Sequence, residues 1–330
     1  LMSKNKKKIV LLLAGGTLLL DKHDRVVFVN GQKDIDNWLQ QMPELSILVD
    51  IEPIFICGED EVITPQIWEK MAEVIVKQQD QADGFVVVSK VENLINTTLA
   101  LSFLLQNFKK TIISTASQIS GTDFIAKKDI IKQLKKKHGG LGLRSNLINA
   151  LQIADQPLPG PAIMFGTRLV PACQAINDYD NDINLFASIN NSYWGKVDFG
   201  VSIKSGLSYS SQKPNFYNKI SSNILVIEDI SGVPWMMTKD YLKNYQAVLI
   251  KLSNKNNLET DKQQQINKWK MPVVIYNYEN NVPTESAVSL TGCTWSTAII
   301  KTMWAVAKQE NLTGFNKIMK QNIIGEFINN

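Results

Sequence analysis

The chain has 330 residues, of which 44% are apolar and 20% are charged, and its formal net charge at pH 7 is +4. This length exceeds what one ordinary hydrophobic core supports, so two domains are expected. The charge is too mild to indicate a nucleic-acid-binding surface, and only two histidines are present, which argues against a histidine triad or a zinc site. Three cysteines without metal-like spacing fit a reduced, cytoplasmic setting: Cys57, Cys173 and Cys293.

The N-terminal stretch KKKIVLLLAGGTLLL predicts the first buried strand. A basic start and an apolar run are also typical of a signal peptide, but Gly15 and Gly16 interrupt the run and no cleavage site follows. Glycines just past a strand let the backbone turn sharply beside a ligand. Thr17 therefore lies where open α/β sheets place their ligands, and it is the first candidate for a functional residue. No later segment is long enough to cross a membrane.

The first half of the chain alternates predicted strands with predicted helices. Thr64 and Pro65 predict the start of a helix, because threonine often caps the N-terminus of a helix and proline suits its first turn. The alternation predicts an α/β fold with a mainly parallel sheet and helices on both faces. The predicted elements are a hairpin or loop at 21–36, strands at 45–56, 85–88, 111–115 and 162–165, and helices from 65, at 93–108 and at 146–154.

The second half repeats this alternation on a smaller scale. Residues 204–222 are rich in Ser, Lys, Asn and Tyr and predict a linker between an N-terminal domain at 1–203 and a C-terminal domain at 223–330. Strands are expected at 223–228, 247–252 and 272–276, with helices at 238–244, 259–270, 296–307 and 315–327. The lysine-rich segment 121–140 fits either a solvated surface helix or a basic amphipathic helix for a partner or membrane surface.

Several stretches, in the same order and spacing, resemble the bacterial L-asparaginase family, and in particular its cytoplasmic type I members. They are LLLAGGTL, ITPQIWEKMAEVI, DGFVVVSKVENLINTTLALSFLL, STASQ, RSNLINALQIA, FGTRLVPACQAINDYDNDINLFASIN and CTWSTAIIKTMWAVA. The resemblance implies a larger N-terminal and a smaller C-terminal α/β domain, a homodimer or homotetramer, a small amide or amino-acid ligand, and no metal or organic cofactor. It also implies a threonine nucleophile supported by a Thr-Lys-Asp group.

The residues at the family's catalytic positions depart from that pattern. Thr17 matches the nucleophile, but the second threonine falls on Val91, which has no hydroxyl to transfer a proton. The aspartate falls on Glu92, whose carboxylate is displaced by one methylene, and a displacement near 1 Å can cost ~10²-fold in rate. The lysine falls on Asn177, which carries no charge. The second catalytic motif is thus expected to be degenerate.

The residues at the family's substrate clamp are altered as well. The positions before Val62 are Glu59, Asp60 and Glu61. The family usually has small hydroxyl or amide residues at the last two, and two carboxylates there would repel a substrate carboxylate. They fit equally a solvated loop. Thr115 and Gln118, at the end of a predicted strand, would either orient a ligand or only bond the backbone. Thr17 has the alternative of satisfying its own turn, and Glu92 that of capping the following helix.

These observations favour an asparaginase-like protein with weak or no L-asparagine amidohydrolase activity that retains a ligand-binding cleft near Thr17. A first alternative is an active amidohydrolase that uses Thr17 on a cationic or uncharged amide, which Glu59, Asp60 and Glu61 would recognise. A second alternative is an interaction protein that uses the basic segment 121–140.

Overall fold

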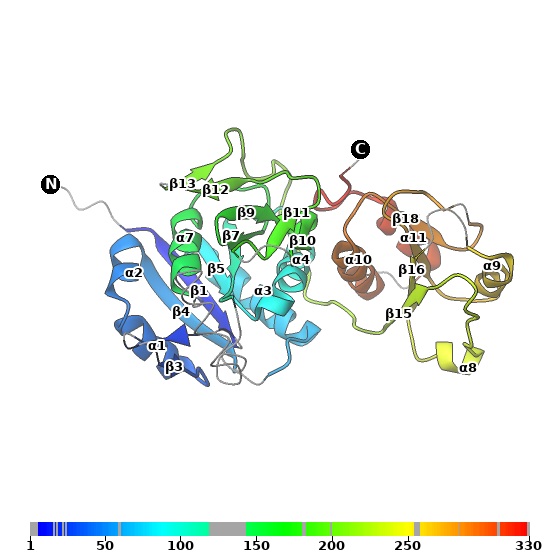
Figure 1. Cartoon of the computed structure of the whole chain (residues 1–330), viewed down its shortest axis with the longest axis horizontal. Coiled ribbons are helices and arrows are strands. Elements are labelled where there is room, and N and C mark those ends of the chain that lie inside the picture. The colour runs from blue at the N-terminus through cyan, green and yellow to red at the C-terminus, as the bar shows by residue number, and fades with distance from the viewer. Residues whose placement is uncertain are drawn as a thin grey trace. The chain divides into compact units, whose positions relative to one another are not determined.

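A computed structural model describes residues 6–15, 17, 19–21, 23, 25–58, 61–118, 143–179, 183–198, 200–253, 258–282, 284–308 and 311–328. The chain forms two compact units, Leu1–Phe216 and Tyr217–Asn330 (Figure 1). The lysine-rich segment 121–140 and Asp60 lie outside the described residues. The division at 204–222 into two domains and a linker stays a prediction. No helix among the described residues is long and apolar enough to cross a membrane.

Unit 1 is built on an eight-stranded sheet in the order β13-β12-β9-β8-β7-β5-β1-β4. The five strands from β8 to β4 run parallel, and β9, β12 and β13 add antiparallel to the β8 edge. The predicted parallel α/β architecture is confirmed. The strands are β1 (Lys8–Ala14), β4 (Asp50–Cys57), β5 (Gly84–Val88), β7 (Thr111–Thr115), β8 (Ala162–Phe165), β9 (Arg168–Pro171), β12 (Gly195–Val197) and β13 (Val201–Ile203).

Helices cover both faces of this sheet (Figure 1). Ile9, Leu11 and Leu13 of β1 pack in one core with α1 and α7, because side chains on a strand alternate between faces. On α3, the Trp68 indole N–H donates to Thr97 Oγ1 of the buried α4 at 3.1 Å. The helices are α1 (Gln32–Gln40), α2 (Pro43–Leu48), α3 (Pro65–Gln78), α4 (Leu94–Leu104) and α7 (Arg144–Ile153), with 3₁₀ turns η1 (Val91–Asn93) and η2 (Ala172–Gln174).

Three predictions for unit 1 need correction. The hairpin or loop expected at 21–36 ends earlier, because helix α1 begins at Gln32. The apolar run at 45–56 is only partly a strand, because its first half continues helix α2 to Leu48 before β4 begins at Asp50. The helix expected at 93–108 ends at Leu104, and the chain continues as a short strand. The short strands pair as hairpins and clips: β2 (Leu19–Leu20) with β3 (Val26–Val27), β6 (Leu105–Gln106) with β14 (Asn215–Phe216), and β10 (Ala175–Asn177) with β11 (Phe186–Ser188).

The outer edge of β4 is capped by one side-chain amide. Gln32 Nε2 donates to the Pro53 carbonyl at 2.7 Å, and Gln32 Oε1 accepts from the Phe55 N–H at 2.9 Å. Pro53 itself has no N–H to offer. The amide of Gln32 thus occupies backbone groups that an edge strand would otherwise present to another chain.

Unit 2 holds a four-stranded parallel sheet in the order β15-β16-β17-β18. The strands are β15 (Ile224–Asp229), β16 (Ala247–Leu252), β17 (Val273–Tyr276) and β18 (Val288–Leu290). The helices are α8 (Lys239–Leu242), α9 (Thr260–Asn267), α10 (Trp295–Lys308) and α11 (Leu312–Lys320). The helix expected at 315–327 is therefore displaced, because the chain leaves the helical path after Lys320 and turns toward Lys301 of α10.

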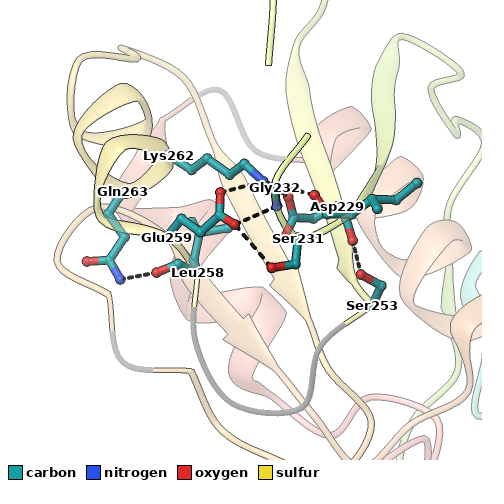
Figure 2. Close-up of polar contacts among 9 residues, drawn as sticks. Asp229, Ser231, Gly232, Ser253, Leu258, Glu259, Lys262 and Gln263 are labelled. Carbon is teal, nitrogen blue, oxygen red and sulfur yellow. Dashed lines mark hydrogen bonds and ion pairs between the residues drawn. The ribbon is translucent and has the colours of Figure 1, made fainter. Parts of the chain in front are cut away.

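Two buried lysines of unit 2 form ion pairs with carboxylates. The ammonium of Lys262 contacts Asp229 Oδ1 at 2.7 Å and Glu259 Oε2 at 3.0 Å, while Glu259 Oε1 accepts from the Gly232 N–H at 2.7 Å (Figure 2). Lys301 and Glu326 form a second ion pair at 2.6 Å, and both side chains are fully buried. We did not predict that either lysine would be buried. The carboxylate that pairs with each ammonium is distant in sequence or lies on the far side of a loop, so no local sequence pattern indicates the ion pair.

Candidate functional site

The candidate site lies at the carboxyl ends of β1 and β5, which are neighbours in the sheet. From β1 the chain passes through α1 and α2 to β4 on one side, then through α3 to β5 on the other side. In the order β4-β1-β5-β7-β8, the direction in which the chain adds new strands to the sheet therefore reverses between β1 and β5. Open α/β sheets bind ligands at such a reversal, outside the carboxyl ends of the strands.

Thr17 lies at this reversal and is 3% exposed. Its hydroxyl donates to the Ser89 carbonyl at 2.8 Å, so the turn after β1 is tied to the turn after β5. The Gly15 N–H donates to the Cys57 carbonyl at 3.0 Å, which ties the same turn to β4. A carbonyl oxygen accepts the threonine proton as a hydrogen bond but cannot remove it, so this contact positions the hydroxyl without activating it.

The other predicted catalytic positions are less enclosed. Val91 begins the 3₁₀ turn η1 and is half-buried, whereas Glu92 in the same turn is exposed. Asn177 is exposed at the end of β10 in a separate two-stranded sheet. Among the described residues, the polar contact recorded for the Thr17 hydroxyl is to a carbonyl and not to any of these three side chains.

The predicted binding residues take different places. Glu61 is exposed, and its Oε1 accepts from the Gly58 N–H at 2.7 Å, so this carboxylate closes its own loop. Thr115 is fully buried and donates to the Met164 carbonyl at 2.8 Å, which fits the backbone-bonding interpretation. Gln118 is half-buried just beyond β7. Asp60 cannot be placed with them because it lies outside the described residues.

Cys57, at the end of β4, does not provide a substitute nucleophile. Burial raises the pKa of its thiol above the ordinary value, and the negative charge of Glu61 acts in the same direction. The Gly15 N–H and the ammonium groups of Lys70 and Lys90 oppose this shift without cancelling it. The thiolate is the reactive form of cysteine, so a raised pKa keeps this side chain inert near neutral pH.

Three residues at this edge of the sheet were not predicted as site residues. Ser89 and Lys90 directly follow the buried strand β5, and a polar pair after an apolar run is the signal that would have pointed to them. Asn146 was placed only on a helix, yet its side chain bridges the Ala116 carbonyl at 2.8 Å and the Gly166 N–H at 3.0 Å. It therefore holds the turns after β7 and β8 together at the same edge of the sheet.

The described residues contain no group of three or more His, Cys, Asp or Glu side chains that could hold a metal ion. The groups that the structure places at this edge include the Thr17 hydroxyl and the Gly15 backbone N–H.

Comparisons with known proteins show which family the chain resembles. A model described as Asparaginase, N-terminal, matches residues 8–128. L-asparaginase 1 of Escherichia coli is 27% identical over 194 residues, a match that covers 56% of this chain and 52% of the relative. The chain therefore spans about half the length of this curated relative. The L-asparaginase of Thermococcus kodakarensis is 22% identical over 288 residues and is matched over 82% of its length.

Solved structures show the same fold. The crystal structure of L-asparaginase I from Vibrio cholerae superposes with a TM-score of 0.74 at 20% identity, covering 98% of this chain and 99% of that one. At this level of identity the likeness concerns the fold alone. The family model, the curated relatives and the shared α/β fold agree, and together they support an asparaginase-family protein.

Proposed function

We propose that this protein binds a small amino acid or amide at the Thr17 turn and hydrolyses L-asparagine weakly or not at all. The observation that carries the proposal is the environment of the Thr17 hydroxyl. This hydroxyl is buried and donates to a backbone carbonyl rather than to a side chain that could act as a base. A threonine hydroxyl needs an adjacent base to become a nucleophile.

The residues around this hydroxyl support the same conclusion. Val91 cannot relay a proton, Glu92 is exposed, and Asn177 is exposed on a separate small sheet. Residues of a catalytic group act as a unit, so the loss of the partners removes most of the rate even where the nucleophile remains. The retained turn, by contrast, keeps the geometry of a ligand-binding reversal point.

Ammonia release from L-asparagine and L-glutamine by the purified protein tests the proposal. We expect kcat well below the usual enzyme range of about 1 to 10³ s⁻¹. The matched control is Thr17→Ala, which should leave any residual rate unchanged if that rate does not pass through the threonine. A wild-type kcat within the usual range, abolished by Thr17→Ala, would overturn the proposal.

Restoring the family's groups tests the cause of the low rate. The triple variant Val91→Thr, Glu92→Asp and Asn177→Lys should release ammonia faster than the wild type, and adding Thr17→Ala should remove the gain. A triple variant as slow as the wild type would mean that the residues at these three positions do not cause the low rate.

A further inference from the structure

An exposed asparagine between β3 and helix α1 has the surroundings of a site of covalent modification. Asn30 is exposed and is followed by Gly31, the residue at the N-cap of α1. The two form the chain's single Asn-Gly pair. In such a pair the glycine nitrogen can attack the asparagine side-chain amide, because glycine has no Cβ to obstruct the approach. Asparagine is accordingly one of the thermolabile residue types.

The two groups that would react are both accessible. A Cβ on Gly31 would have no other heavy atom within 4 Å, so the space beside this residue is open. Asp34 holds the backbone on either side: its carboxylate accepts from the Asn30 N–H at 2.9 Å, and its N–H donates to the Gly31 carbonyl at 3.2 Å. Between these contacts, neither the Gly31 N–H nor the Asn30 amide makes a hydrogen bond to any residue that the structure describes. The first N–H groups of a helix have no partner within the helix, so this nitrogen stays available.

Other asparagines lack this combination. Asn191 is also exposed, but the N–H of the next residue, Ser192, donates to Asn190 Oδ1 at 3.0 Å, and serine carries a Cβ. Asn146 is 5% exposed, and both the nitrogen and the oxygen of its amide are hydrogen-bonded. Exposure, a free following nitrogen and the absence of a Cβ coincide at Asn30.

The side chain of Asn30 faces the turn that follows β4. Asn30 Oδ1 and Glu61 Oε1 lie 3.5 Å and 3.6 Å from the position that a Cβ on Gly58 would occupy. The same Glu61 oxygen accepts from the Gly58 N–H at 2.7 Å and so closes this turn. A carboxylate at position 30 would add a like charge beside that of Glu61 and would weaken this contact.

We propose that Asn30 deamidates spontaneously and that the carboxylate formed there loosens the Gly58–Glu61 turn. The Gly31 nitrogen forms a bond to Asn30 Cγ and loses its proton, the bond from Cγ to Nδ2 breaks, and ammonia leaves with that proton. A cyclic imide remains. Water then opens the imide at either of its two carbonyl carbons, which gives aspartate or isoaspartate at position 30. The inference does not depend on the proposed ligand site.

Mass spectrometry of the full chain, incubated for days at mildly alkaline pH and physiological temperature, tests the modification. Asn30 is the only asparagine in the tryptic peptide 26–33. We expect the mass increase of an amide-to-carboxyl exchange to accumulate in this peptide, while Asn191 stays intact. The matched control is Gly31→Ala, which fits an extended backbone with a φ of −170° and open space. It should slow the reaction by about tenfold or more, because the added Cβ obstructs the attack.

Thermal melting of four full-length chains tests the effect on the turn. They are the wild type, Asn30→Asp, Glu61→Gln and the double variant. A carboxylate near the N-terminus of α1 also favours the helix, and the comparison with and without Glu61→Gln cancels that contribution. We expect Asn30→Asp to shift the melting temperature downward more when Glu61 is present than when it is replaced.

Each result decides one step of the inference. An intact Asn30 after the incubation overturns the modification, and equal rates in the wild type and Gly31→Ala overturn attack by the Gly31 nitrogen. An equal melting shift with and without Glu61→Gln overturns the loosening of the turn. The proposed function is judged separately, because ammonia from deamidation cannot exceed one molecule per Asn30, whereas ammonia from hydrolysis grows with the substrate supplied.

Discussion

The buried pair of Lys301 and Glu326 makes the sharpest stability prediction in unit 2. Glu326 Oε1 accepts from the Lys301 ammonium at 2.6 Å, and Oε2 accepts from the Ile323 and Ile324 N–H groups at 2.8 and 2.7 Å. Burial lowers the pKa of Lys301, and the charge of Glu326 opposes that shift. The Glu326 carboxylate is therefore the hydrogen-bond acceptor in each of these contacts.

Glu326→Gln keeps the shape of the side chain but replaces one acceptor with an NH₂ group. Whichever way the amide turns, its NH₂ faces either the lysine ammonium or two backbone N–H groups, and a buried ammonium loses its counter-charge. Removing one partner of a buried pair costs about 3–5 kcal/mol. At about 4 °C or more per kcal/mol for a domain of roughly 100 residues, the melting temperature of unit 2 should fall by about 12 °C or more.

Urea unfolding followed by far-ultraviolet circular dichroism measures this cost. The matched control is Asp240→Asn, which breaks an ion pair whose lysine and aspartate side chains are 75% and 87% exposed, and it should change stability by no more than about 0.5 kcal/mol. The double variant Lys301→Met with Glu326→Gln should be more stable than the sum of the single losses predicts. If Glu326→Gln unfolds at the same urea concentration as Asp240→Asn, the reasoning is refuted.

Three further predictions concern other charged and reactive groups. Hydrogen bonds from the Arg25 backbone, the Arg25 side chain and the His23 backbone lower the pKa of Asp21 to about 2, so its stabilisation is complete above about pH 4 and is lost as the pH falls toward 2. Melting curves should accordingly show wild type and Asp21→Asn converging between pH 5 and pH 1, each about a pH unit outside those limits, and a constant gap would contradict this. Lys262→Met leaves Asp229, whose side chain is 5% exposed, without its ammonium, and should cost about 1–3 kcal/mol in urea unfolding, whereas an unchanged midpoint would count against the network in Figure 2. The three buried cysteines should react with a thiol reagent only after unfolding, and rapid labelling of the native protein would show that Cys57 is more accessible than its burial indicates.

The strands of both sheets could be predicted where a short apolar run was bounded by turn residues. β5, β7 and β16 lie where the sequence indicated, because a fully apolar run between turn residues has few other ways to be buried. The run at 45–56 could not be divided correctly, because helix α2 and strand β4 are both apolar and no glycine separates them. Periodicity alone cannot distinguish a buried strand from a buried helical turn.

The place of Thr17 in the fold was predictable, but its contacts were not. The Gly-Gly-Thr run after β1 indicated the correct edge of the sheet, because that edge follows from topology. The Thr17 contact to Ser89 joins residues 72 apart in sequence, so it leaves no local pattern. The exposed position of Asn177 likewise depends on the pairing of β10 with β11 and not on its own neighbours.

The amide of Gln32 has a consequence for how this molecule behaves in crowded solution. It stands where the peptide group of an added strand would stand, and it satisfies both the Pro53 carbonyl and the Phe55 N–H. An approaching chain must displace an uncharged side chain that already makes two good hydrogen bonds, so it gains little by docking there. One glutamine thereby disfavours the pairing of another chain with β4 at Pro53 and Phe55.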